Sequence, residues 1–307
     1  AIMKTSSIEM IDEMGDFTGF ASDVKLIYSG EFTIKVAKTE ENVTDNYLSS
    51  DDVINVYISG IDSRGGINEV SRSDVNIIMS VNKKTHNILM INTPRDYYVP
   101  LSVSNIVRDK LTHAGVYGIE CSRNTLEMLY GIQIDYYVKV NFSGFEKIID
   151  SLGGVDVTLD YSATLSQAGN LTVHNGVNHF NGEQALAFAR ERYAYLDGDR
   201  QRGRNQMMIM EAAIKKACSP AIISNYTSVL SEVSKNVITD MSYDFIADLA
   251  QTQLNDMAAW NITQISVTGV GSYSSTTYSM PEWSLYIMVP DEESVENARE
   301  QIRDNYN

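Results

Sequence analysis

Three apolar stretches in the first third of the chain have the length and composition of buried β-strands. They are VINVYIS (53–59), VNIIMSVN (75–82) and HNILMINT (86–93). Gly60 ends the first stretch, Pro94 ends the third, and Lys83-Lys84 separates the second from the third. We therefore predict a hairpin across the lysine pair, with the second and third strands as antiparallel neighbours.

Helix-like and strand-like patterns alternate through the rest of the chain. Predicted helices cover 122–131, 142–152, 181–190, 204–218, 221–236, 243–258 and 291–304, and predicted strands cover 134–141, 155–159, 262–267 and 285–289. Asn181 lies three residues before Gln184, which is the spacing of a capping box at a helix start. This alternation predicts an α/β domain in which helices layer against a sheet.

The first fifty residues are polar and weakly patterned by comparison. They contain one strand-like stretch at 24–37, and residues 39–52 have the composition of an acidic linker. No stretch of the chain reaches the eighteen or so apolar residues that a membrane-spanning helix needs. We expect the 307 residues to be soluble.

Composition limits the classes of partner. A chain of 307 residues, 43% of them hydrophobic, can bury a large core. Its formal net charge of −16 argues against nucleic acid as a partner, because nucleic-acid binding depends on lysine and arginine neutralising phosphates. A partner that carries phosphate would have to be bound by a local cluster of positive charge.

Several kinds of catalytic site lack the residues they need. The four histidines have no metal-ligand spacing and the two cysteines form no CxxC pair, so zinc chemistry and a cysteine nucleophile are poorly supported. The sequence has no Walker A loop, no GxGxxG and no GxSxG. Cys121 and Cys218 either pair in an oxidising compartment or remain two partly buried thiols in helices, and the sequence leaves both open.

Positive charge is concentrated in the stretch ARERYAYLDGDRQRGRNQ (189–206). It holds five of the twelve arginines in the chain, Arg190, Arg192, Arg200, Arg202 and Arg204. Arg190 and Arg192 would point the same way if the helix gives way there to extended chain. Arg202 and Gln206 are four residues apart and share one face of the next predicted helix.

Arginine suits phosphate because its planar fork makes two-point contacts with phosphate oxygens and stays charged in a partly desolvated site. The alternative is a solvated surface network in which Glu191, Asp197 and Asp199 pair with the arginines. That alternative accounts for Arg200 and Arg204 more readily than for the others, because a surface network needs no preference for arginine over lysine.

Four more charged residues lie next to the ends of the predicted strands. Asp62 follows the first strand, Arg72 and Asp74 precede the second, and Arg95 follows the third. If these strands are antiparallel in turn, all four lie at one edge of the sheet. Each aspartate alone could be a turn residue that bonds local amides. Together they suit Mg²⁺ (or Mn²⁺), a hard cation that keeps several waters and takes further ligands from phosphate.

Over about residues 50–290 the chain resembles the LytR–CpsA–Psr family. The motifs that carry the resemblance are GIDSR, SRSD, INTPRD, DKLTHAGVYG, YYVKVNFSGFEKIIDSLGGVDV, FNGEQALAFARERY and DRQRGRNQ. Each motif is modest alone, but their order and spacing are specific. The chain is most similar to the streptococcal capsule-linked, CpsA-like branch.

The resemblance implies an α-β-α sandwich with a mixed central sheet and a groove for a prenyl lipid. It implies an extracellular phosphotransferase that moves a glycopolymer, of the capsular polysaccharide or teichoic acid type, from a polyprenyl-pyrophosphate carrier to peptidoglycan through a phosphodiester. In that branch an accessory domain precedes the catalytic one. Residues 1–42 would then be a remnant of it or a linker region, and residues 43–307 the catalytic domain.

The resemblance also assigns the site residues. It implies a metal pair of Asp62 and Asp74, pyrophosphate contacts from Arg72, Arg95, Lys110, Arg190, Arg192, Arg202 and Gln206, and catalytic roles for Asp74, Arg95, Arg190 and Arg192. It places the protein at the extracellular face of a Gram-positive cell membrane, attached through an N-terminal anchor that is missing from this sequence. The apolar faces of 142–152 and of the helices after 204 are the expected walls of the groove.

Two other functions remain open for the same residues. A polyprenyl-pyrophosphate hydrolase would use the same site with water in place of a sugar hydroxyl. A polyprenyl-phosphate-binding module would need the groove but not the paired aspartates. A DNA-binding regulator fits poorly with the net charge of −16.

Overall fold

The computed structural model describes residues 8–11, 33–36, 48, 50–62, 67, 70–104, 107–166, 170–194, 198–223 and 226–307. The chain divides into two compact units, Ala1–Tyr47 and Leu48–Asn307. In the first unit, β1 (Ile8–Ile11) pairs antiparallel with β2 (Thr33–Val36). β2 falls within the strand-like stretch 24–37, whose other residues lie outside the described ones. Whether this unit is a remnant of an accessory domain stays a prediction.

The second unit is built on a six-stranded sheet, and the predicted mixed character of the central sheet is confirmed. Its strands in spatial order are β13 (Val237–Thr239), β8 (Tyr136–Asn141), β3 (Val53–Ile61), β4 (Ser73–Asn82), β5 (Asn87–Asn92) and β14 (Asn261–Ser266). β4 is antiparallel to both β3 and β5. β8 is parallel to β3 and β14 is parallel to β5, whereas β13 is antiparallel to β8. The predicted hairpin across the lysine pair is therefore confirmed. The end of β3, the start of β4 and the end of β5 meet at one edge.

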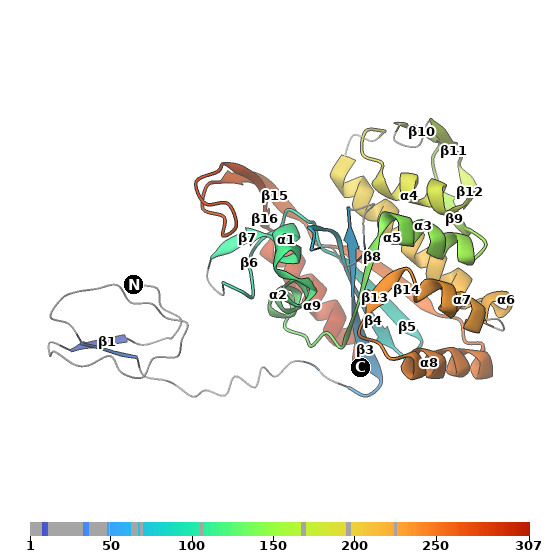
Figure 1. Ribbon diagram of the computed structural model, residues 1–307, viewed down its shortest axis with the longest axis horizontal. Helices are drawn as coiled ribbons and strands as arrows, with labels where there is room; N and C mark the ends of the chain where they lie inside the picture. The colour runs from blue at the N-terminus through green and yellow to red at the C-terminus, as the bar shows by residue number, and fades with distance from the viewer. Residues whose placement is uncertain are drawn as a thin grey trace. The chain divides into compact units, whose positions relative to one another are not determined.

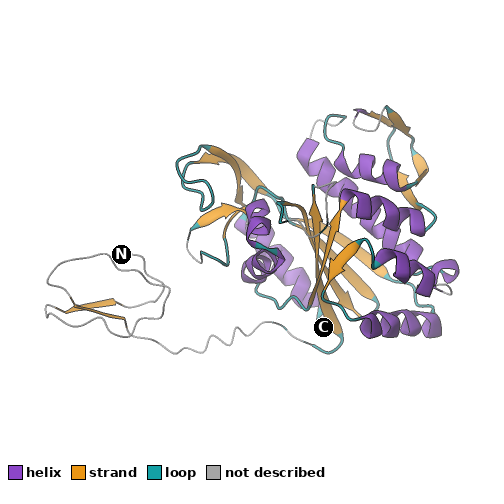
Figure 2. Ribbon diagram, viewed as in Figure 1, coloured by secondary structure: helices purple, strands orange, loops and turns teal. Residues whose placement is uncertain are grey.

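Helices cover both faces of this sheet (Figures 1 and 2). Side chains alternate between the two faces along a strand. On one face, Tyr57 and Ile78 belong to a core with α2 (Ile119–Tyr130) and α9 (Glu292–Asn305). Their neighbours on the strands, Val56 and Ile77 among them, pack on the other face against α5 (Gly198–Ala217) and α8 (Tyr243–Asp256). The predicted α-β-α sandwich is confirmed.

A third core lies beside α5. It contains residues of α3 (Phe142–Ser151), α4 (Gly182–Arg190), β9 (Val155–Leu159) and β12 (Gly176–Phe180). The rings of Phe180 and Phe188 stack in this core with their centroids 5.2 Å apart. α4 begins with the predicted capping box. The Asn181 side chain accepts from the Gln184 N–H at 2.9 Å, and the Gln184 side chain accepts from the Asn181 N–H at 3.1 Å.

Several elements differ from the predictions. α5 begins at Gly198 rather than at 204, so Arg200, Arg202 and Arg204 all lie within this helix. The helix predicted over 221–236 is divided into α6 (Pro220–Ile223) and α7 (Tyr226–Val233), and β13 follows it.

Short elements escaped prediction because three or four residues show no periodicity. They are β6 (Tyr98–Pro100), β7 (Arg108–Lys110), α1 (Leu111–Ala114), the 3₁₀ turn Gly115–Tyr117, β10 (Ala163–Leu165) and β11 (Leu171–Val173). β15 (Gly269–Ser274) was missed as well, although its hairpin partner β16 (Leu285–Pro290) was predicted.

The two cysteines are both free, Cys121 buried in α2 and Cys218 half-buried just after α5. Among the described residues, no helix combines the length and the apolar character that crossing a membrane requires.

Candidate functional site

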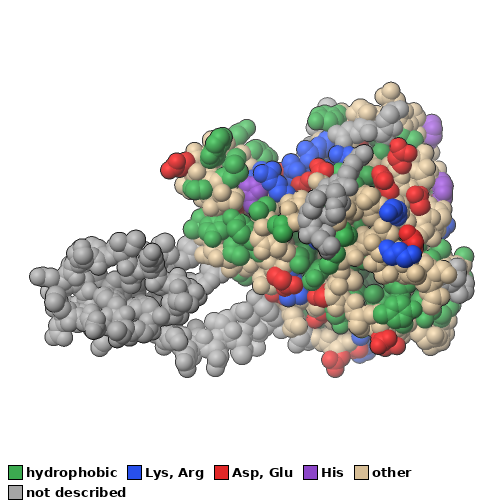
Figure 3. All heavy atoms as spheres, in the orientation of Figure 1, with side chains coloured by type: hydrophobic (Ala, Val, Ile, Leu, Met, Phe, Trp, Pro, Cys, Tyr) green, Lys and Arg blue, Asp and Glu red, His purple; other side chains and the backbone are tan. Residues whose placement is uncertain are grey.

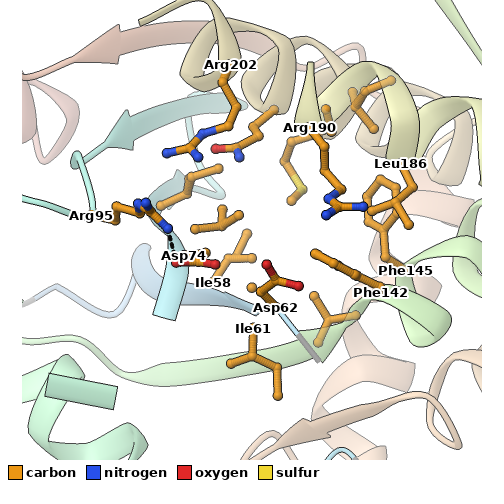
Figure 4. Close-up of a pocket in the computed structure, with 18 of the residues that line it drawn as sticks. Ile58, Ile61, Asp62, Asp74, Arg95, Phe142, Phe145, Leu186, Arg190 and Arg202 are labelled. Carbon is orange, nitrogen blue, oxygen red and sulfur yellow. Dashed lines mark hydrogen bonds and ion pairs between the residues drawn. The ribbon is translucent and has the colours of Figure 1, made fainter. Parts of the chain in front are cut away.

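A cavity of about 350 Å³ lies between the sheet edge and the helices α3, α4 and α5 (Figure 4). It brings together most of the predicted site residues. Those that line it are Asp62, Asp74, Arg95, Arg190, Arg192, Arg202 and Gln206.

The two aspartates reach the cavity through an irregularity in the sheet. Gly60 of β3 pairs with Val75 of β4, whereas Ile61 pairs with Ser73, so Asp74 has no partner in this register. This is a β-bulge, which bends a strand and re-aims a side chain. In a regular strand Asp74 and Val75 would face opposite sides of the sheet, yet both line the cavity. In Figure 4 the carboxylates of Asp62 and Asp74 point into the same space.

Arg190 and Arg192 face this space from the end of α4. Arg190 is the last residue of the helix, and Glu191 is extended (φ −64°, ψ 133°), so the two arginines both line the cavity as expected. The Arg190 guanidinium lies 4.3 Å from the centre of the Phe142 ring, a cation–π contact that holds it in place.

Glu191 between them is fully buried and was not predicted as a site residue. Its Oε1 accepts the backbone N–H groups of Arg192 at 2.9 Å, Tyr193 at 2.7 Å and Ala194 at 3.1 Å. The sequence suggested Glu191 as an ion-pair partner for the arginines, which stays a prediction; these bonds show that its carboxylate also shapes the turn. The sequence feature that could have identified Glu191 is its position between two arginines at the end of a helix.

Arg95 follows β5 and contacts two carboxylates. Its Nη1 donates to Asp74 Oδ1 at 2.8 Å, and its Nε lies 3.5 Å from Asp96 Oδ2. Asp96 is buried, with 7% of its surface exposed, and its Oδ1 lies 2.5 Å from Lys110 Nζ. The chain of alternating charges from Asp74 to Lys110 fixes the Arg95 guanidinium at the cavity wall. Thr112 also donates to Asp74 Oδ1, at 3.5 Å.

Arg202 and Gln206 lie on α5, above the sheet edge. The helix comes close to the end of β5 because residue 203 is glycine: a Cβ there would lie 2.6 Å from Asn92 Nδ2. Arg202 is only 9% exposed. The predicted sharing of one helix face by Arg202 and Gln206 is confirmed, since both line the cavity.

The other end of the cavity is apolar. Phe142 and Phe145 of α3, Leu186 of α4, Ile209 and Met210 of α5, and Ile58, Ile61, Val75, Ile77 and Val140 of the sheet line it. In Figure 4 the two phenylalanines and Leu186 lie at the opposite end from Arg95. Of the expected groove walls, α3 and α5 line this end, whereas no described residue of the later helices α6, α7 and α8 contributes to its lining.

Two predicted residues do not line this cavity. Lys110 is directed to Asp96 instead. Arg72 is exposed, because β4 begins only at Ser73 and the strand alternation that would align Arg72 with Asp74 does not extend to it.

The acidic pair fits a hard cation but not a complete protein cage. Among the described residues, no group of three His, Cys, Asp or Glu side chains could hold a metal. Asp62 is exposed, and no hydrogen bond or ion pair to it is formed within the described part of the chain. Mg²⁺ is commonly held by one or two carboxylates together with waters and substrate phosphate, so Asp62 and Asp74 suit it.

Known proteins resemble this chain in sequence and in fold. The sequence profile described as the LytR_cpsA_psr family matches residues 25–297. The polyisoprenyl-teichoic acid–peptidoglycan teichoic acid transferase TagU of Bacillus cereus is 33% identical over 211 residues, covering 67% of this chain and 66% of the relative. The chain thus spans about two thirds of the length of that relative.

Solved structures show the same fold. Bacillus subtilis TagV superposes with a TM-score of 0.70 at 26% identity, covering 84% of this chain and 98% of the other. A structure of TagT bound to LI-WTA superposes with a TM-score of 0.68 at 25% identity, covering 86% and 95%. The resemblance in the motifs is confirmed, while the capsule-linked branch stays a prediction. The chain belongs to the LytR–CpsA–Psr family.

Proposed function

We propose that this protein transfers a glycopolymer from a polyprenyl-pyrophosphate carrier to peptidoglycan. The observation that carries the proposal is the division of one cavity into a polar end, with arginines and two aspartates, and an apolar end. A polyprenyl pyrophosphate has the same two parts. Relatives named as teichoic acid–peptidoglycan transferases support the reaction type.

The apolar end would hold the prenyl chain. Each CH₂ group removed from water contributes about 0.8 kcal/mol, so the aromatic and aliphatic walls bind the carrier strongly. The phosphates would then lie between Arg95, Arg190, Arg192 and Arg202. Arginine donors that are already in position before the reaction begins stabilise the negative charge that develops on the departing phosphate.

Asp62 and Asp74 would hold Mg²⁺ (or Mn²⁺) at the pyrophosphate. When bound, the cation supplies Lewis-acid neutralisation of phosphate charge. Asp74 is also fixed by Arg95, which sets where its free oxygen points.

The reaction exchanges one phosphorus–oxygen bond for another. An acceptor hydroxyl oxygen bonds to the sugar-linked phosphorus, and the bond from that phosphorus to the bridging oxygen breaks. Polyprenyl phosphate leaves with the electron pair, and the hydroxyl proton passes to water. We place this reaction at the extracellular face of a Gram-positive cell membrane, with attachment through an N-terminal anchor.

One incubation tests the proposal. The protein is mixed with a lipid-pyrophosphate oligosaccharide, Mg²⁺ and uncrosslinked peptidoglycan, and the glycan joined to peptidoglycan is measured. We expect joined product that requires both substrates. If only free sugar phosphate forms with acceptor in excess, the protein is a pyrophosphate hydrolase, and water takes the place of the hydroxyl.

A further inference from the structure

A second cavity, of about 230 Å³, adjoins the first. The two share one wall, made of Asp74, Arg95, Arg202 and Gln206. The first cavity extends from this wall over β4, β3 and β8, towards the apolar end. The second extends the other way, over the ends of β5 and β14 to the start of the β15–β16 hairpin, and Asn92, Thr93, Ser266, Gly269 and Met288 line it.

The second cavity has two arginines that the first lacks. Arg200 and Arg204 line it and are absent from the first. Both are exposed, and they lie one turn apart on α5. Arg204 Nη1 donates to Gln201 Oε1 at 3.0 Å, and the described part of the chain contains no ion pair to either arginine. Asp197 and the Asp199 side chain, two of the partners in the suggested surface network, lie outside the described residues.

Negative charge is scarce in the same cavity. Asp74 is the one carboxylate among its described lining residues, and Arg95 already pairs with it. Lys and Arg side chains gather in the hollow between the β15–β16 hairpin and the region of α4 and α5 (Figure 3). A ligand of this cavity should thus carry negative charge.

The geometry of phosphoryl transfer indicates which ligand occupies the second cavity. The attacking and leaving oxygens lie roughly in line on opposite sides of the phosphorus. The leaving group is the polyprenyl phosphate, whose chain occupies the apolar end of the first cavity. The attacking hydroxyl must therefore arrive from the side of the shared wall that faces away from that end, which is the second cavity.

We propose that the second cavity binds the acceptor, an anionic glycan strand, and that Arg200 and Arg204 hold its carboxylates. The inference rests on the proposed transferase function. A peptidoglycan strand fits, because its sugars carry hydroxyl groups and its lactyl-linked peptides carry carboxylates. Arg200 and Arg204 then determine acceptor affinity, while the arginines of the shared wall contact the phosphates.

The test is a steady-state comparison of two variants with equal charge changes. Arg200→Gln/Arg204→Gln alters the cavity, and Lys215→Gln/Lys216→Gln alters the far end of the same helix. With a lipid-pyrophosphate oligosaccharide as donor and uncrosslinked peptidoglycan strands as acceptor, we expect the first variant to raise the acceptor KM about tenfold, since charge-assisted hydrogen bonds are lost. Its kcat and donor KM should stay close to those of the wild type. The lysine variant should match the wild type in all three.

A second arm uses acceptor strands whose carboxylates are capped as amides. The wild-type KM should rise towards that of the arginine variant, and the variant should respond little. If the wild type forms no joined product at all, the proposed function fails. If it does join the substrates and the arginine variant keeps the wild-type acceptor KM, or raises the donor KM instead, the acceptor site is overturned.

Discussion

Two carboxylates of the second unit, Asp109 and Asp62, have opposite environments. Asp109 of β7 is fully buried and bonded on all sides: Oδ1 to His113 Nδ1 and to the Lys110 N–H, both at 2.7 Å, and Oδ2 to the Ser279 N–H at 2.7 Å. Asp62, at the end of β3, is exposed and lacks any protein partner among the described residues. A carboxylate that the protein has satisfied stabilises the fold, whereas one left unsatisfied at a cavity is available to a ligand.

The largest expected effect comes from the aspartate pair at the cavity. Asp62→Asn and Asp74→Asn should each lower the transfer rate about 10³-fold, because metal stabilisation of phosphate charge contributes several kcal/mol. The free energy of unfolding should change little in Asp62→Asn. Calorimetric titration of Mg²⁺ in the presence of a prenyl pyrophosphate checks the cause. Metal dependence that stays unchanged in both variants would contradict the metal site.

Next in size are the arginines at the end of α4. Arg190→Lys and Arg192→Lys should each lower kcat about 10²-fold, since lysine keeps the charge but loses the two-point geometry. Initial rates at saturating donor measure this. Full activity in both lysine variants would show that only net charge matters at this end of the cavity.

The satisfied carboxylate should respond in stability rather than in chemistry. Asp109→Asn should lower the free energy of unfolding by about 2–3 kcal/mol, because buried donors lose a charged acceptor. Denaturant unfolding measures it, with Asp248→Asn on the exposed face of α8 as the control, expected within about 0.5 kcal/mol of the wild type. An Asp109→Asn protein as stable as the wild type would remove the contrast between Asp109 and Asp62.

The smallest effect is the dependence of that stability difference on pH. Burial raises the pKa of Asp109, but the hydrogen bonds from His113 and Ser279 outweigh it, so the pKa lies below its ordinary value. A depressed carboxyl pKa adds stability that is full above the unfolded value of about 3.9 and is lost as the pH falls through the folded pKa. The gap in unfolding free energy between wild type and Asp109→Asn should thus narrow below about pH 4. A gap that widens in acid would mean that Asp109 is not the group responsible.

The sheet edge and much of the site could be predicted from the sequence, because apolar residues recur at regular spacings in long strands and helices. The antiparallel pairing of β4 and β5 was predicted from their apolar stretches and the turn between them. That of β3 and β4 was only a condition in the sequence analysis, and the structure meets it. The two pairings bring Asp62, Asp74 and Arg95 to one edge. The end of α4 was readable for the same reason, since a capping box marks its start and its apolar positions mark its length.

What the sequence could not supply depends on contacts between distant segments. Lys110 has a suitable side chain, but the pairing of β7 with β6 brings it to Asp96. The role of Glu191 required knowing that its carboxylate is buried against its own following amides. The second cavity needed the position of β15, a largely exposed strand with little apolar pattern that was not predicted.

The bulge at Asp74 has a consequence for how this fold changes through evolution. Deleting one residue from a strand usually turns every later side chain to the wrong face. Here the opposite holds: removal of Asp74 itself would join Ser73 directly to Val75 and complete a regular ladder with β3. Loss of a single codon would therefore leave an intact sheet without the carboxylate that we propose as a metal ligand. A member of the family could become catalytically silent in one step and still fold, and a missing residue at this point is what would identify such a protein in a genome.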